Sequence, residues 1–271
     1  MALKWNVTNP MTKTNLRVEL VLLTPELAAQ WLECNFGNRP LNNGAIRSYE
    51  SAISRGEWQV NGETIVFCDD GSLASGQHRC HAVISAGKPI ETLVVHGVSR
   101  SAFPTMDLGR RRNASDSLGI DGEANTNRLA AAVRTYLTYS MTTYEANVIS
   151  PTQIRACLAE HPEIRYWVQK TISSKQVRKF SSSLDGYMAL ASEKHGIAKL
   201  DEFFEQLDSG IGLQAGSPAL LLRERLLNQT VTRVSKLNAD AFMIKAINAH
   251  IAGKTLSFLR LNPSEPFPRL V

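Results

Sequence analysis

The chain has 271 residues, of which 43% are hydrophobic, so it can bury a substantial core and is not disordered as a whole. Its net charge of +5 permits an acidic partner such as nucleic acid without identifying one. No apolar run approaches the roughly 18 residues of a membrane span, and residues 1–17 lack the apolar core of a secretory signal. The four cysteines are scattered without a CxxC pair, which indicates reduced, buried thiols. We therefore expect a cytoplasmic protein with no membrane partner.

The first half of the chain mixes strand and helix patterns. Residues 1–15 are predicted to form a polar arm, and a strand is expected over 16–23. Thr24 and Pro25 are typical of a helix N-cap and first helical position. The further strands and helices that we expect in this half lie at 43–54 (helix), 64–67 (strand), 72–75 (strand), 77–86 (helix), 90–98 (strand), 101–105 (one helical turn) and 113–118 (helix).

From residue 125 onward, the apolar spacing is helical throughout. The helices expected there lie at 128–139, 151–159, 162–172, 182–195, 199–207, 218–228 and 239–251. We predict an α+β protein, with a mixed α/β domain at 16–120, an all-helical domain at 125–260 and an extended tail at 261–271. Asp121-Gly122-Glu123 is the expected joint between the two domains.

One stretch brings chemically active residues together where a strand becomes a helix. Gly76-Gln77-His78-Arg79 follows the strand at 72–75 and opens the next helix. A helix start presents unpaired N–H groups and the positive end of the helix dipole, which attract phosphate. Gly76 lets a ligand approach the backbone, Arg79 offers a planar cation, and His78 is a donor or an acid/base near neutral pH. The same residues also fit an ordinary helix start with an exposed histidine and arginine.

A carboxylate is predicted to lie near this helix start. Asn61-Gly62-Glu63 precedes one strand, and the Asp69-Asp70-Gly71 turn folds the next strand back against it. We therefore expect Glu63 and Gly76 at the same end of the sheet. Glu63 is there either a catalytic or metal-orienting group or a surface residue in a turn.

Two basic clusters are candidates for contact with phosphate. Asp107 and Arg110-Arg111-Arg112 follow the strand at 90–98 and form either a second wall of the same pocket or a solvated or DNA-facing patch. Lys175, Arg178 and Lys179 form a looser cluster in the helical half, where nucleic acid and plain solvent are the alternatives.

The remaining chemical signals are weaker. The sequence contains no HExxH, GxxxxGK[ST], GxSxG or zinc-ligand spacing, so no metal ligands are assigned. His81 and His96 lie in or beside apolar segments and are expected to be structural. A metal-dependent nuclease needs several converging ligands, and four carboxylates are near enough to consider: Glu63, Asp69, Asp70 and Asp107.

The order of these motifs resembles the N-terminal domain of the ParB/sulfiredoxin superfamily. Asn38-Arg39-Pro40 stands in the place of that superfamily's first motif, and Gly76-Gln77-His78-Arg79 in the place of the loop that holds the phosphates of ATP or CTP. The His-Arg pair is more similar to the sulfiredoxin and free-serine-kinase branch than to the partition proteins. Gln77 replaces the sulfiredoxin cysteine and the partition-type Arg-Arg is absent, so neither sulfinic-acid reduction nor CTP-gated DNA clamping is implied.

Most of the chain also resembles a group of uncharacterised phage and bacterial ParB-like proteins. The resemblance rests on Asn61-Gly62-Glu63, on residues 107–112 (DLGRRR), on Lys245-Ala246-Ile247-Asn248-Ala249 and on the tail at 265–268 (EPFP). Ser75 stands where that group commonly has an aspartate, which argues against a metal ligand at this position.

Taken with the resemblance, these residues predict a protein that binds a nucleotide, ATP with Mg²⁺ first, and hydrolyses it or transfers its phosphoryl group to a hydroxyl acceptor, on or with DNA. Glu63 and His78 are the expected catalytic residues. The expected nucleotide-binding residues are Arg39, Asn61, Gly76, Gln77, His78, Arg79, Asp107, Arg110, Arg111 and Arg112. The alternatives are a non-catalytic ParB-like DNA-binding protein, with Lys175, Arg178 and Lys179 as contacts, and a metal-dependent nuclease.

Overall fold

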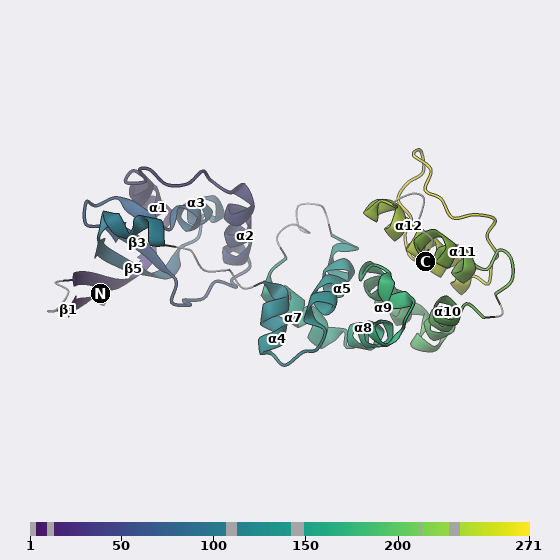
Figure 1. Cartoon of the computed structure of the whole chain (residues 1–271). Coiled ribbons are helices and arrows are strands. Elements are labelled where there is room, and N and C mark those ends of the chain that lie inside the picture. Colours follow the sequence, from purple (N-terminus) through teal and green to yellow (C-terminus); the bar gives the residue numbers. More distant parts are fainter. Residues whose placement is uncertain (1–3, 10–13, 107–112, 142–148, 212, 228–233) are drawn as a thin grey trace. The chain divides into compact units, whose positions relative to one another are not determined.

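A computed structural model describes residues 4–9, 14–106, 113–141, 149–211, 213–227 and 234–271 (Figure 1). The chain divides into two compact units, residues 1–111 and residues 112–271. The division falls before the joint predicted at residues 121–123. The reason is that helix α4 (Ala114–Ile120) packs against later helices and buries Leu118 in the core of the second unit. Residues 113–120 therefore belong with the helical unit and not with the mixed domain predicted for 16–120.

The first unit contains a five-stranded mixed sheet in the order β1-β2-β5-β3-β4. All neighbouring pairs are antiparallel except β3 and β5, which run parallel and are separated in the chain by β4 and α3. The strands are β1 (Lys4–Asn9), β2 (Thr14–Leu23), β3 (Thr64–Cys68), β4 (Leu73–Ser75) and β5 (Ile90–Val98). The polar arm predicted for residues 1–15 is wrong, since β1 pairs along its whole length with β2.

Three helices pack together on the sheet and enclose the core of the first unit (Figure 1). They are α1 (Pro25–Leu32), α2 (Asn43–Ser54) and α3 (Gln77–Ala86). Alternate residues of the strands, such as Ile65 and Phe67 in β3 and Val94 in β5, are buried under them. The predicted cap of α1 is confirmed, because the Thr24 hydroxyl accepts the Leu27 N–H at 3.2 Å.

The described part of the second unit consists of helices and their connections. After α4 come α5 (Thr126–Thr138), α7 (Pro151–Glu160), α8 (Glu163–Ser173), α9 (Ser183–His195), α10 (Ile197–Ser209), α11 (Pro218–Leu227) and α12 (Lys236–Ile251). Helix α9 contacts α5, α8, α10 and α12 and is buried along most of its length. The fold is therefore mixed α+β, as predicted, with the strands confined to the first unit among the described residues.

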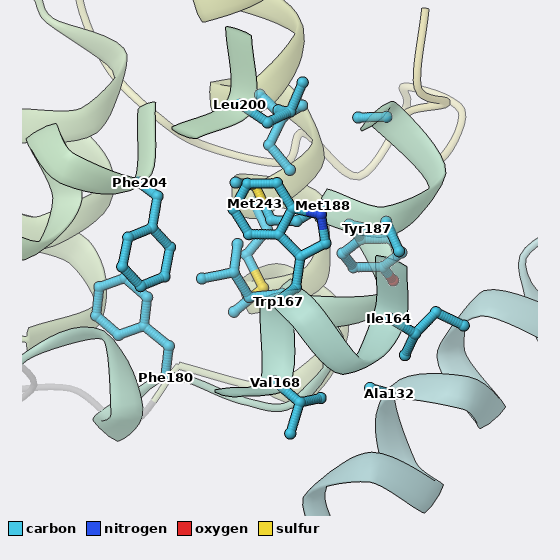
Figure 2. Close-up of a cluster of buried hydrophobic side chains, with 14 of the residues drawn as sticks. Ala132, Ile164, Trp167, Val168, Phe180, Tyr187, Met188, Leu200, Phe204 and Met243 are labelled. Atoms are coloured by element: carbon cyan, nitrogen blue, oxygen red, sulfur yellow. The ribbon is translucent and has the colours of Figure 1, made fainter. Parts of the chain in front are cut away.

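The core of the second unit surrounds Trp167, which is fully buried (Figure 2). Met188, Leu200 and Met243 lie around its indole ring, and they come from three different helices. The indole N–H is not left unsatisfied, because it donates to the Ser192 hydroxyl at 2.9 Å. Trp167 thus ties α8 to α9 at the centre of the unit.

The residues after α12 run without regular secondary structure, as predicted for the tail, but they are fastened to the helices. The Lys245 ammonium donates to a Glu265 carboxylate oxygen at 2.6 Å and to the Arg260 carbonyl at 2.7 Å. The Asn248 side-chain amide donates to the Arg269 carbonyl at 2.7 Å. The Lys-Ala-x-Asn-Ala pattern noted in the sequence therefore has a structural use, because its two polar residues hold the tail against α12.

Among the described residues, no helix combines the length and the apolar character that crossing a membrane requires.

Candidate phosphate site at the start of helix α3

Helix α3 begins at a glycine that no other residue can easily replace. Gly76 has φ +118° and ψ −4°, a conformation that side chains other than glycine rarely adopt. A Cβ at this position would lie 2.9 Å from both γ-carbons of Ile65 in the neighbouring strand. Among the described residues, no side-chain hydrogen bond caps the helix start. The backbone of α3 therefore begins tight against β3.

A cavity of about 270 Å³ opens at this helix start. Its lining comes from the loop after α1, from β4, from the first residues of α3 and from the 3₁₀ turn Arg100–Thr105 with the residue that follows it. The lining residues are Asn38, Arg39, Ala74, Ser75, Gly76, Gln77, His78, Phe103 and Met106. The lining combines polar residues, among them the cationic Arg39, with an aromatic residue and a methionine, Phe103 and Met106, which form its apolar wall.

Gln77 lines the cavity, but its side chain is occupied with holding the loop after α1. Its amide nitrogen donates to the Arg39 carbonyl at 2.9 Å, and its amide oxygen accepts from Asn35 at 3.0 Å. Asn38 adds a bond from its amide to the Leu73 carbonyl at 2.6 Å. Because Gln77 is only 4% exposed, these bonds are shielded from water. Gln77 thus positions Arg39 beside the helix start, and it is not placed as a direct phosphate ligand.

His78 is engaged in the same way. Its Nε2 accepts the Asn42 N–H at 3.0 Å, at the start of α2, and the residue is 7% exposed. An Nε2 that accepts a hydrogen bond carries no proton, so the neutral ring holds its proton on Nδ1. Proton transfer at Nε2 would require this contact to the backbone of α2 to break.

Arg79 does not reach the cavity. Its guanidinium donates to the Thr64 carbonyl at 2.7 Å, the residue is 6% exposed, and it is absent from the lining. The position of Arg79 therefore does not support the prediction that it binds phosphate. Among the described residues, Arg39 is the arginine that lines the cavity, and it is exposed.

Asn61 and Glu63 lie at the predicted end of the sheet, yet outside the cavity lining. The pairing of Val66 with Ser75 puts the residues before β3 and the residues after β4 at the same end of the hairpin. There the Asn61 side chain accepts the Glu63 N–H at 3.1 Å and closes a turn. Glu63 is exposed, and neither residue contributes to the lining.

The remaining residues predicted near the site either lie outside the described residues or have a structural role. Asp107, Arg110, Arg111 and Arg112 lie outside the described residues. Asp70 accepts from the Ser72 hydroxyl and the Ser72 N–H, and these bonds hold the pKa of Asp70 below its usual value. The carboxylate of Asp70 is thus used to form the β3–β4 turn.

The apolar wall of the cavity was not predicted. The sequence indicates one helical turn at 101–105, and the structure shows that this turn presents Phe103 to the cavity. Arg100 anchors the turn, because its guanidinium lies 4.6 Å from the Phe103 ring centre and donates to the Phe36 carbonyl at 3.3 Å and the Ser72 hydroxyl at 3.2 Å. An arginine two or three residues before an aromatic residue is too common a pattern to have identified this wall.

In the second unit, Lys175, Arg178 and Lys179 are all exposed within one short segment. The segment is fixed underneath by Val177 and Phe180, which are buried in the helical core. The structure therefore leaves all three basic residues exposed to solvent, as either a DNA contact or a solvated patch requires.

Comparisons of this chain with family models, with curated proteins and with solved structures found no match. The likeness to the ParB/sulfiredoxin superfamily accordingly stays a prediction from the sequence motifs.

Proposed function

We propose that the first unit binds a nucleotide through its phosphates in the cavity at the start of α3, with ATP as the first candidate. The observation that carries this proposal is the meeting of an uncapped helix start, a lining arginine and an aromatic wall in one cavity. The helix start supplies backbone N–H groups and partial positive charge to phosphate oxygens. Arg39 supplies a permanent charge, with a planar fork that matches two phosphate oxygens.

The apolar wall favours a nucleotide over inorganic phosphate. Phe103 offers a flat ring held by Arg100, and a base that stacks on an aromatic ring contributes about 1–3 kcal/mol. The cavity volume of about 270 Å³ lies just below the ~300–1,000 Å³ typical of small-molecule sites. A bound nucleotide would therefore stay partly exposed to solvent, which predicts modest affinity.

Mg²⁺ fits this site only as part of the nucleotide complex. The described lining contains no carboxylate, and Mg²⁺ in nucleotide sites is held largely by phosphate oxygens and water. When bound, Mg²⁺ would supply charge neutralisation for the phosphates. The chain's own contribution is the helix start and Arg39.

Binding is better supported than a reaction on the nucleotide. Of the two predicted catalytic residues, Glu63 is exposed outside the cavity lining, and His78 uses Nε2 to accept the Asn42 N–H. A base must come within hydrogen-bond reach of the proton it removes. Hydrolysis and phosphoryl transfer to a hydroxyl therefore stay as predictions that follow from the resemblance.

Calorimetry with ATP, ADP, CTP and GTP, each with and without Mg²⁺, tests the proposal on the full chain. We expect saturable binding of at least one nucleotide and a weaker response to pyrophosphate, since pyrophosphate cannot use the Phe103 wall. Arg39→Ala should weaken binding about tenfold or more, as expected for the loss of a charged hydrogen bond worth ~1.5–3 kcal/mol. Arg47→Ala is the matched control, because Arg47 is exposed on α2 outside the cavity lining.

Arg79→Ala is a poorer test than it appears from the sequence. Arg79 donates to the Thr64 carbonyl of β3, so its loss would destabilise the fold, and any change in nucleotide binding would follow from that. Absence of binding for all four nucleotides, or equal binding by the Arg39→Ala and Arg47→Ala variants, would overturn the assignment of this cavity.

A second candidate function, contact with DNA, is favoured by the exposed basic segment at 175–179. Each phosphate contact contributes about 0.9 to the slope of log affinity against log salt concentration. Replacing Lys175, Arg178 and Lys179 by glutamine should therefore lower that slope by about 2.7 if all three residues contact phosphates. A salt dependence that is unchanged by these substitutions would exclude this surface.

A further inference from the structure

The helical unit contains a cluster that combines one imidazole, two carboxylates and a phenol. His161 caps the C-terminal end of α7, Glu163 opens α8, and Glu193 lies in the last turns of α9. One ligand atom of each lies within 4.8 Å of the others, and all three side chains are of types that can bind a metal ion. Tyr136 of α5 adds its hydroxyl, 2.9 Å from Nδ1 of His161.

One atom of this cluster lacks the partner that its burial calls for. Oε1 of Glu163 is buried from solvent and has no hydrogen-bond partner among the described residues. Such an acceptor is normally paired with a donor, a water molecule or a cation. Nδ1 of His161 lies 3.4 Å from it, which is too far for a good hydrogen bond.

That separation suits a shared metal ion better than it suits a hydrogen bond. Zn²⁺ binds histidine nitrogen and carboxylate oxygen at about 2.0–2.2 Å, and two such ligands at a tetrahedral angle lie about 3.3–3.5 Å apart. The 3.4 Å between Nδ1 of His161 and Oε1 of Glu163 matches this ligand-to-ligand distance. Glu193 approaches the same Nδ1 more closely, at 2.7 Å, and must move back by a little over half an ångström to share an ion.

The surroundings can hold Glu193 in place after such a shift. The Tyr136 hydroxyl donates to the carboxylate of Glu193, and the preceding residue, Ser192, is fixed by the Trp167 indole at 2.9 Å. Hydrogen bonds to a ligating carboxylate orient it and are part of most metal centres. Tyr136 is therefore a positioning residue for this cluster.

We propose that His161, Glu163 and Glu193 form a binding site for a divalent transition-metal ion, with Zn²⁺ as the first candidate. One nitrogen and two oxygen ligands suit Zn²⁺ or Mn²⁺, whereas Mg²⁺ prefers oxygen ligands alone. Three protein ligands leave a fourth position for water, as in zinc sites that bind or activate a further molecule. The site lies in the helical unit and does not depend on the nucleotide site proposed above.

The alternative explanation is a set of ion pairs without a metal. Glu163 occupies the first turn of α8, where a carboxylate is favourable beside the helix dipole, and His161 pairs with Glu193 directly. Ion pairing accounts for Glu193 at hydrogen-bond distance, but it brings Oε1 of Glu163 only to 3.4 Å from His161 and leaves this buried atom without a hydrogen-bond partner.

Calorimetry with Zn²⁺ on chelator-treated, full-length protein distinguishes the two explanations. We expect one Zn²⁺ per chain, checked by elemental analysis after gel filtration. Losing a second-shell partner typically costs about 10–100-fold in metal affinity, so losing a ligand in His161→Gln or Glu163→Gln should cost at least ~100-fold. Glu160→Gln is the matched control, because Glu160 is an exposed carboxylate at the end of α7 that is not part of the cluster.

Two further measurements keep the result independent of folding defects. Circular dichroism shows whether each variant is folded, and Glu163→Gln keeps the shape of the side chain. Visible absorption of the Co²⁺-loaded protein reports a four-coordinate site, and this signal should disappear in Glu163→Gln. Absence of saturable Zn²⁺ binding below about 1 mM, or an affinity that is the same in Glu163→Gln and Glu160→Gln, would overturn the proposal.

Discussion

Replacing Gly76 by alanine tests how tightly the start of α3 is packed against β3. The backbone at Gly76 has φ +118°, and residues forced into such sparsely populated regions cost about 1–3 kcal/mol. The new Cβ would also lie 2.9 Å from Cγ1 and Cγ2 of Ile65, well inside the ~3.5–4.0 Å at which carbon atoms attract. Ile65 is fully buried and cannot swing away freely, so overpacking adds about 1–3 kcal/mol. We expect a total loss of roughly 2–6 kcal/mol.

The two contributions can be separated by a double-mutant cycle with Ile65→Ala. This change removes both γ-carbons and leaves only the Cβ of residue 65, 3.2 Å from the new methyl group. In the Ile65→Ala background, Gly76→Ala should therefore cost mainly the backbone strain, about 1–3 kcal/mol, because only the 3.2 Å contact with the Cβ of residue 65 remains. The coupling energy between the two positions should be about 1–3 kcal/mol, equal to the steric contribution that the cycle removes.

Gly62→Ala supplies the matched control for backbone strain alone. Gly62 also has a positive φ, +82°, but a Cβ there would meet nothing within 4 Å. Its replacement should cost about 1–2 kcal/mol in either background.

Hydrogen exchange measured by mass spectrometry suits this experiment, because the chain has two compact units and exchange in the β3 and α3 peptides reports the first unit by itself. If Gly76→Ala costs the same in both backgrounds to within about 0.5 kcal/mol, the steric reasoning is refuted. A cost for Gly76→Ala no larger than that of Gly62→Ala would refute it equally.

Two further predictions concern the helical unit. Burial raises the folded-state pKa of Asp185 to about 6, while the bonds from Arg128 and Thr171 oppose this shift. Since the folded pKa lies above the unfolded ~3.9, the contribution of Asp185 to stability is fully present below about pH 4 and is lost as the pH rises through 6. Arg128→Leu leaves this carboxylate buried without its ion pair, so it should destabilise the unit by about 3–5 kcal/mol at pH 8 and by clearly less at pH 5. Urea denaturation at both pH values measures the loss of stability. An equal loss at the two pH values would contradict the prediction. Lys245→Ala removes the hydrogen bonds to Glu265 and to the Arg260 carbonyl. The backbone amides of the tail should therefore exchange hydrogen several-fold faster, while those of α9 keep their rates. Unchanged exchange in the tail would show that Lys245 does not hold it.

The sequence by itself determined most of the helices and strands of this protein. The start of α1 follows from Thr24 and Pro25, and the start of α7 from Ser150, whose hydroxyl accepts the Gln153 N–H at 3.1 Å. The end of α3 follows from Gly87, which has φ +62°. These signals are readable because a cap or a terminating glycine acts on residues only three or four positions away.

The strand β1 shows where such local signals are insufficient. Trp5 is 48% exposed and Val7 is 53% exposed, so the strand has no buried face that a hydrophobic pattern could reveal. It exists because its backbone pairs with β2, from Lys4 opposite Glu19 to Asn9 opposite Thr14. This backbone pairing with the next strand in the chain leaves no hydrophobic pattern, and the polar composition of residues 1–15 concealed it.

Part of the candidate site also followed from local sequence signals, and part depended on the tertiary structure. The position of Gly76 at a strand-to-helix junction followed from the sequence, because it depends on neighbouring residues. The directions of the side chains after it did not, since Gln77 is bonded to Asn35, 42 positions away, and His78 to Asn42, 36 positions away. Phe103 reaches the cavity from a turn beyond β5. Only the packing of these distant segments against one another decided that Arg39, and not Arg79, faces the cavity at the start of α3.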